Sequence, residues 1–187
     1  MPSIDRNLER AGPVADNERM TVTVRAVTAQ DGLGRAALWL EGGRYFAAID
    51  PAAAREPDAE GLVEWLDDIW ARSTADPAML MLVAERDGAL VGSVVARRLE
   101  PVTSARFQMQ RDLGVRRVHV DALLVAASAR RSGVGTALLA AVEQWAAEHG
   151  AQVVTLETGL GNPTSVPFYE ERMGYHRHEV VFRKALR

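Results

Sequence analysis

The chain has 187 residues, enough for one ordinary domain. Hydrophobic residues make up 48% and charged residues 25%, the mix of a soluble globular protein, and a net charge of −3 excludes a strongly basic nucleic-acid footprint. The absence of cysteine excludes disulfides, thiolate metal sites and a cysteine nucleophile. No apolar run approaches the roughly 20 residues of a membrane span. No secretory signal is visible at the N-terminus, so we expect a cytoplasmic protein.

The first part of the chain predicts a tail followed by one domain. Residues 1–20 are polar and mixed in charge, which predicts a flexible N-terminal tail ahead of a domain over residues 21–187. Valines alternate with polar residues over 21–28, a pattern typical of a half-buried strand. Asp31 is expected to cap a helix that runs to about Leu40.

Residues 41–61 contain three glycines and two prolines, so they are predicted to be loop or broken structure. Apolar residues at helical spacing then predict a helix from Leu62 to about Ile69. Two short apolar runs follow, 79–85 and 90–97, with Asp87-Gly88 between them. That dipeptide is a strong signal for a two-residue hairpin turn.

The second half of the chain alternates strands with helices. Strands are predicted over 116–125 and 152–157, with a helix over 133–149 between them that ends at a glycine. A short helix over 165–173 and a final strand over 179–183 complete the pattern. The predicted fold class is therefore mixed α/β, with one central sheet flanked by helices.

Charge is distributed unevenly along the chain. Residues 41–68 hold eight acidic residues and two arginines, whereas residues 97–131 hold eight arginines and three acidic residues. Such runs are usually solvated faces, but they also suit a cationic ligand near the first segment and an anionic ligand near the second.

A strand, a basic loop and a glycine-containing helix start follow one another over residues 123–139. Helix N-termini expose unpaired N–H groups, and glycines let a phosphate approach that backbone closely. Leu138 stands where a P-loop starting at Gly133 needs its second Gly, and where a dinucleotide fingerprint starting at Gly133 needs Gly or Ala. The pattern that is present is Arg-x-x-Gly-x-Gly, at Arg130, Gly133 and Gly135.

A competing interpretation is a dinucleotide-binding unit near the N-terminus. Residues 32–37 read Gly-x-Gly-x-x-Ala after a strand, and Asp50 follows a segment, 44–49, that could form a second strand. Two features argue against an NAD-dependent oxidoreductase: the first strand alternates polar and apolar residues, and no regular βαβ units follow.

A second motif lies near the C-terminus, where Asn162, Ser165, Phe168-Tyr169 and Gly174-Tyr175 stand at the spacing Asn-x-x-Ser-x-x-Phe-Tyr-x-x-x-x-Gly-Tyr. Together with the Arg-x-x-Gly-x-Gly loop, this element resembles the GCN5-related N-acetyltransferase (GNAT) superfamily. The resemblance implies a GNAT-type domain in which two parallel strands splay apart to hold acetyl-CoA. The implied cofactor-binding residues are Leu123, Leu124, Val125, Arg130, Arg131, Ser132, Gly133, Val134, Gly135, Thr136, Asn162 and Ser165.

The resemblance also implies the chemistry: direct transfer of acetyl from acetyl-CoA to an amine in a ternary complex, without a metal. Tyr169 would protonate the departing thiolate, and a backbone N–H near Leu124 would stabilise the oxyanion. Asp121 is the preferred general base, with His119, Glu85 or a water chain as alternatives. His176 and His178 lack a third ligand, so no metal site is expected.

The acceptor is expected to contact residues 28–79, a long, acidic segment with several aromatic residues. It suits a cation with an apolar body, such as an aminoglycoside-like compound, a polyamine, an amino-acid derivative or a peptide amine. Trp65 is expected to lie in the helix core. Homodimers are common in the family, so a homodimer is expected, without an identified interface. A non-catalytic acyl-CoA sensor with the same fold is the second alternative.

Overall fold

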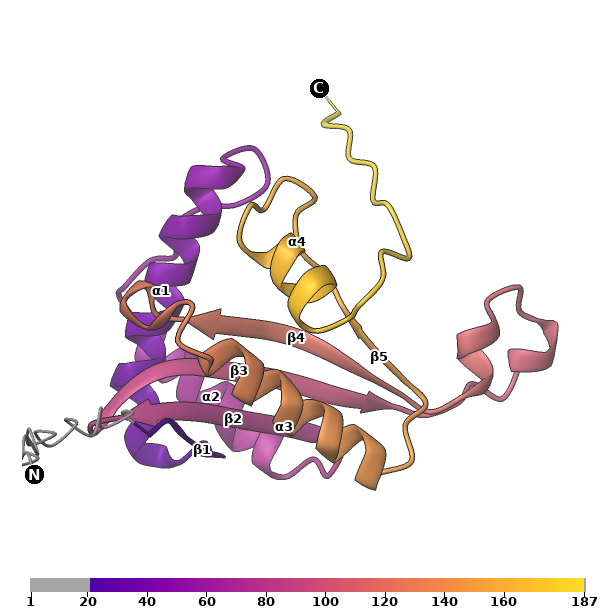
Figure 1. The fold of residues 1–187 in the computed structure, drawn as a ribbon, viewed down its shortest axis with the longest axis horizontal. Helices are drawn as coiled ribbons and strands as arrows, with labels where there is room; N and C mark the ends of the chain where they lie inside the picture. The colour runs from indigo at the N-terminus through magenta and orange to yellow at the C-terminus, as the bar shows by residue number, and fades with distance from the viewer. Residues whose placement is uncertain (1–20, 187) are drawn as a thin grey trace, which may run out of the picture.

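A five-stranded sheet with the order β1-β2-β3-β4-β5 forms the centre of the computed structural model, which describes residues 21–186 (Figure 1). The strands are β1 (Thr23–Ala26), β2 (Met79–Arg86), β3 (Ala89–Leu99), β4 (Arg117–Val125) and β5 (Val153–Leu156). Neighbours from β1 to β4 are antiparallel, whereas β4 and β5 run parallel. The mixed α/β class predicted from sequence is confirmed. The predicted tail, residues 1–20, lies outside the described residues.

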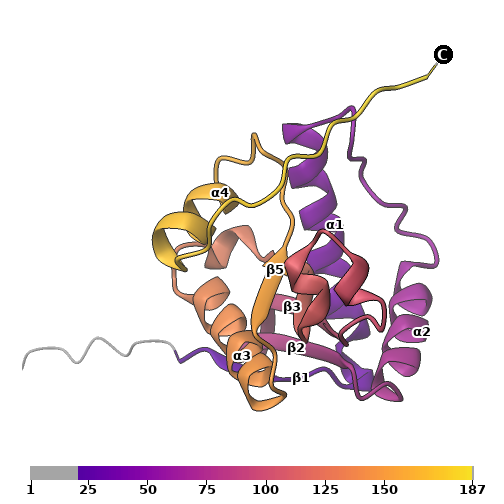
Figure 2. The ribbon, with the colours of Figure 1, turned by 90° about the vertical axis from the view of Figure 1, so that its right-hand side faces the viewer.

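Helices cover both faces of the sheet (Figure 2). α3 (Val134–Glu148) packs on one face, and α1 (Gly32–Ile49) and α2 (Leu62–Thr74) cover the other. Val118 and Val120 of β4 are buried in the same cluster as Leu138 of α3. Because strand side chains alternate between faces, His119 points towards the face that α1 and α2 cover.

The hairpin between β2 and β3 is confirmed. Asp87 and Gly88 both adopt positive φ angles, 53° and 76°, and the residues on either side of them, Arg86 and Ala89, are paired. Two left-handed residues match the twist of the flanking strands, which is why Asp-Gly favours this turn.

The predicted loop over 41–61 is wrong in its first part, because α1 continues through two glycines to Ile49. A Cβ at Gly42 would lie 2.7 Å from Leu124 Cδ2, and a Cβ at Gly43 would lie 2.1 Å from Pro57 Cδ. The glycines therefore let the helix approach β4 and the following loop closely. This tertiary packing overrides their low helix propensity.

The dinucleotide-binding alternative is also wrong. Residues 44–49 are helical rather than a second strand, and β1 is an edge strand antiparallel to β2. Asp31 precedes α1 as predicted, but its carboxylate does not cap that helix. It accepts hydrogen bonds from the Thr28 backbone N–H (2.7 Å) and from Arg25 (2.8 and 2.9 Å), which lowers the pKa of Asp31 to about 2.

Short helical turns occupy the connections. They are η1 (Ala29–Asp31), η2 (Ala105–Phe107), η3 (Arg111–Gly114), η4 (Ala127–Ala129), α4 (Ser165–Pro167) and η5 (Phe168–Arg172). The segment with η2 and η3 projects beyond one end of the sheet (Figure 1). Within residues 21–186, none of the helices has both the length and the apolar character needed to cross a bilayer.

The final strand predicted over 179–183 is wrong. Residues 176–186 are exposed and belong to neither a helix nor a strand, and the segment runs away from the sheet (Figures 1 and 2). Phe182 is 92% exposed and Val180 is 65% exposed. A short apolar run forms a strand only where a neighbouring strand completes its hydrogen bonds.

We expect Gly92→Ala to destabilise the fold, because Gly92 lies where β3, β4 and α3 meet. A Cβ at this position would lie 2.8 Å from Val134 Cγ1, 2.9 Å from Leu138 Cδ1 and 3.0 Å from the Leu124 carbonyl oxygen. Overpacking of this kind costs about 1–3 kcal/mol, and urea unfolding would measure the loss. Gly159→Ala is the control, because its Cβ would meet nothing within 4 Å. Equal stability of the two variants would contradict the prediction.

Candidate functional site

The two parallel strands separate halfway along β4. The ladder between β4 and β5 ends at the pair Val120 and Leu156, whereas β4 continues to Val125. In the ladder with β3, Val95 pairs with Ala122 and Ala96 with Val120, so Asp121 is an extra, bulged residue. A bulge bends its strand and ends local pairing. Within residues 21–186, the backbone of residues 121–125 is therefore left without a strand partner on its β5 side.

The predicted phosphate loop lies directly at the end of this free edge. Arg131 and Gly133 adopt positive φ angles of 60° and 91°, which fold the loop back so that α3 begins at Val134. The first-turn N–H groups of a helix have no intrahelical acceptor, and they carry the positive end of its dipole. This arrangement, with Arg130 and Arg131 beside it, is suited to a polyanion.

The side chains of Val134, Ser132 and Arg130 contact other parts of the protein rather than only solvent. Val134 is 1% exposed, so only its backbone can contact a ligand. The Ser132 hydroxyl donates a hydrogen bond to the Ala129 carbonyl oxygen (2.7 Å) and so stabilises the loop itself. Arg130 Nε lies 3.4 Å from the Val125 carbonyl oxygen, at the junction of loop and strand.

Asn162 lies on the other side of the gap, in the loop between β5 and α4, and is 2% exposed. Its Oδ1 accepts hydrogen bonds from the backbone N–H groups of Thr164 (3.1 Å) and Ser165 (3.0 Å), and its Nδ2 donates to Thr158 Oγ1 (3.3 Å). Tyr45 of α1 also reaches this loop, a contact that the sequence analysis missed because no local pattern links residues so far apart.

Tyr169 lies in η5 next to α3, among other aromatic rings. Its ring centroid is 5.3 Å from that of Phe168 and 6.2 Å from that of Tyr175. Burial raises the pKa of the Tyr169 phenol above its ordinary value. The Tyr175 hydroxyl instead donates a hydrogen bond to Glu143 (2.9 Å). A phenol that resists ionisation keeps its proton available for donation.

The three candidate bases occupy different environments. Asp121 Oδ1 lies 3.1 Å from an Arg97 guanidinium nitrogen and 3.9 Å from His119 Nε2. The other ring nitrogen of His119 is hydrogen-bonded to Thr155 Oγ1 (2.9 Å). Glu85 lies in β2, separated from β4 by β3, and forms an ion pair with Arg25 (2.8 Å). The sheet therefore places Asp121 and His119 at the strand separation and Glu85 away from it.

No metal-binding group was found in the described part of the chain. His176 and His178 are exposed, and residues 21–186 hold no cluster of three or more His, Cys, Asp or Glu side chains able to coordinate an ion.

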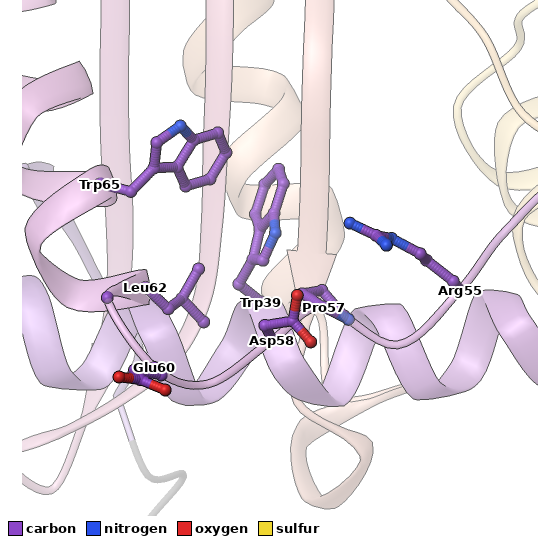
Figure 3. Close-up of a pocket in the computed structure, with 8 residues that line it drawn as sticks. Trp39, Arg55, Pro57, Asp58, Glu60, Leu62 and Trp65 are labelled. Carbon is purple, nitrogen blue, oxygen red and sulfur yellow. The ribbon is translucent and has the colours of Figure 1, made fainter.

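A cavity of about 400 Å³ lies between α1, α2 and the segment that connects them. The indoles of Trp39 and Trp65 form one wall, with ring centroids 5.7 Å apart (Figure 3). Asp58 and Glu60 also line the cavity, and the Arg55 guanidinium points towards Trp39. The expectation that Trp65 lies in the helix core is wrong, because Trp65 is 46% exposed and faces this cavity.

Comparison with known proteins agrees with this geometry. Residues 46–175 match the family described as Acetyltransferase (GNAT) family. A curated relative, "Acetyl transferase GW6a" of Oryza sativa subsp. japonica, is 32% identical over 117 residues, which is 60% of this chain. The match spans only 27% of the length of that relative.

Solved structures share the fold. A transcriptional regulator from Bacillus halodurans C-125 superposes with a TM-score of 0.69 at 18% identity, covering 89% of this chain and all of that one. The aminoglycoside N-acetyltransferase AAC(6')-Iy in complex with CoA gives a TM-score of 0.62 at 16% identity, covering 89% of this chain and 95% of that one.

We expect Gly135→Asp to weaken acetyl-CoA binding by about tenfold or more, because it adds negative charge at the helix N-terminus. Titration calorimetry would measure the change. Gly135→Ala is the matched control: its Cβ would lie 3.3 Å from Phe168 Cζ, so it tests bulk without charge. Unchanged affinity in the aspartate variant would mean that this loop does not bind the pyrophosphate.

Proposed function

The chain belongs to the Acetyltransferase (GNAT) family, and from this membership we propose that it transfers acetyl from acetyl-CoA to a primary amine of a small molecule or peptide. The observation that carries the proposal is the separation of β4 from β5 beside a basic helix N-terminus. In acetyl-CoA the thioester lies at one end of a long arm that contains amide groups, and the arm leads to a pyrophosphate. The open strand edge can hydrogen-bond the arm, and the basic helix N-terminus beside it can bind the pyrophosphate.

Each part of acetyl-CoA has a counterpart at the site. The unpaired backbone of Leu123, Leu124 and Val125 can hydrogen-bond the pantetheine amides as an added strand would. The N–H groups of residues 131–136, together with Arg130, would hold the pyrophosphate. Asn162 and Ser165 would border the pantetheine arm from the opposite side of the gap.

The proposed reaction forms a bond between the amine nitrogen and the acetyl carbon and breaks the bond between that carbon and sulfur. Asp121, which lies at the bulge, would accept the proton that the amine must lose. A backbone N–H near Leu124 would stabilise the oxyanion of the tetrahedral intermediate. Tyr169 would donate its phenolic proton to the departing thiolate, and because burial raises the pKa of that phenol it is protonated at neutral pH.

The cavity beside Trp39 and Trp65 supports a cationic acceptor with an apolar body. Indole faces attract organic cations, and the Asp58 and Glu60 carboxylates add opposite charge. The Arg55 guanidinium at the same cavity would favour an acceptor that also carries a polar or anionic group. A cytoplasmic location, the absence of nucleic-acid and membrane partners, and a homodimeric state are further parts of the proposal.

Titration with acetyl-CoA, with NAD as the control ligand, tests the cofactor. A panel of amines would follow, with the released thiol measured directly, because the chain has no thiol of its own. Binding of acetyl-CoA with turnover of at least one amine supports the proposal. Binding without turnover of any amine would favour the acyl-CoA sensor, and no binding would overturn both.

We expect Tyr169→Phe to slow turnover by roughly 100-fold or more, the usual contribution of a general acid, with little change in acetyl-CoA affinity. The wild-type rate should persist at alkaline pH until Tyr169 ionises, above the pH at which a free tyrosine would. Steady-state kinetics across pH would measure both effects. Tyr175→Phe, which removes a neighbouring phenol bound to Glu143, is the control. Full activity of Tyr169→Phe would exclude this residue as the acid.

We expect Asp121→Asn to remove the acidic limb of the pH profile of kcat/KM, because an amide cannot accept the amine proton. Glu85→Gln, a carboxylate change two strands away in the same sheet, should leave the profile intact. A profile that is unaltered by Asp121→Asn would assign the base to His119 or to a water chain.

A further inference from the structure

Tyr45 connects α1 to both sides of the gap between β4 and β5. Its hydroxyl donates a hydrogen bond to Thr164 Oγ1 (2.7 Å) and lies 3.2 Å from Asn162 Oδ1. The Arg130 guanidinium carbon lies 4.2 Å from the centroid of its ring. Asn162 and Thr164 belong to the loop that follows β5, whereas Arg130 belongs to the loop that follows β4. One half-buried side chain thus contacts both loops at once.

The contact with Arg130 positions its guanidinium without using its hydrogen-bond donors. Arginine has five N–H donors in the plane of the guanidinium, and the cation–π contact engages only one face of that plane. Nε is directed at the Val125 carbonyl oxygen (3.4 Å), so the other four N–H bonds remain for a ligand. Stacking on Tyr45 therefore restricts a long, flexible side chain to one orientation at the phosphate loop.

The contact with the second loop completes an internal hydrogen-bond network. Asn162 is 2% exposed, and both ends of its amide are bonded within its own loop, to Thr158, Thr164 and Ser165. The Tyr45 hydroxyl reaches the outer edge of this network. Through these contacts it joins the loop after β5 to α1.

We propose that Tyr45 is a cofactor-positioning residue, which orients Arg130 towards the pyrophosphate through its ring and holds the Asn162 loop against the pantetheine arm through its hydroxyl. The inference rests on the proposed binding of acetyl-CoA. It adds a residue of α1, the helix that also carries Trp39 of the acceptor cavity, to the cofactor site. Substitution of this one side chain should therefore affect cofactor affinity from outside both loops.

Titration calorimetry of wild type, Tyr45→Leu and Tyr45→Phe tests the proposal. Tyr45→Leu removes ring and hydroxyl, and should weaken acetyl-CoA binding by about tenfold. Tyr45→Phe keeps the ring over Arg130 and should restore affinity to within about threefold of wild type. Phe46→Leu is a stringent control: the Phe46 ring packs edge-on against Tyr45, with centroids 5.7 Å apart, but has no stacking contact with Arg130. Equal affinity of Tyr45→Leu and wild type would overturn the inference.

Two further titrations separate positioning from general loss of structure. Pantetheine has no pyrophosphate, so Tyr45→Leu should weaken its binding much less than it weakens acetyl-CoA binding. In an Arg130→Met background, Tyr45→Leu should lose most of its tenfold effect on acetyl-CoA, because the residue it orients is absent. A tenfold effect that persists in that background would show that Tyr45 does not act through Arg130.

A ligand-free measurement keeps this inference distinct from the proposed function. Amide hydrogen exchange over 126–133 and 158–165 should be faster in Tyr45→Leu than in wild type and unchanged in Phe46→Leu. Unchanged exchange in Tyr45→Leu would overturn the inference even if acetyl-CoA binds. Failure of the wild type to bind acetyl-CoA would overturn the proposed function and, with it, the cofactor role of Tyr45.

Discussion

One extra residue in β4, Asp121, stands where the ladder between β4 and β5 ends. A bulge bends the strand that contains it and increases its local twist. The second half of β4 therefore presents unpaired N–H and C=O groups to the gap, and its end directs the chain into the loop before α3. The opening between the strands, the phosphate loop and the position of the candidate base all follow from this local change of direction.

α1 borders the proposed cofactor site from the face of the sheet opposite α3. Its two central glycines let it lie against Leu124 and Pro57, which brings one side of the helix to the cofactor gap and another to the cavity lined by Trp39. The same helix thus borders both proposed substrates. A shift of α1 along its axis would change both sites together. The geometry of the proposed amine site therefore depends on that of the proposed acetyl-CoA site.

Sequence alone predicted the features that depend on residues close together in the chain. The turn at Asp87-Gly88, the helix start at Gly133 and the helix stop at Gly150 each follow from local backbone preferences, and all are present. The separation of β4 from β5 was expected only through the family resemblance. No pattern within the strand itself marks Asp121 as a bulge, because pairing with β3 and β5 decides it.

The predictions that failed depend on distant partners. The helix through Gly42 is stabilised by contact with Leu124, and Tyr45 meets residues more than 100 positions away. The expected strand at 179–183 has a short apolar run, Val180 to Phe182, but no neighbouring strand in the described part of the chain. Exposure of Trp65 likewise depends on how α2 lies against α1, which helical spacing cannot show.

Where β3, β4 and α3 meet, one residue serves both the hydrophobic core and the proposed phosphate loop. Val134 is fully enclosed in the hydrophobic core, yet its backbone N–H belongs to the first turn of the helix that faces the phosphate loop. Stability therefore depends on the side chain of this residue and the proposed ligand binding on its backbone, so a substitution at Val134 would affect both. Substitutions in the projecting segment between β3 and β4, by contrast, can change stability without touching this junction.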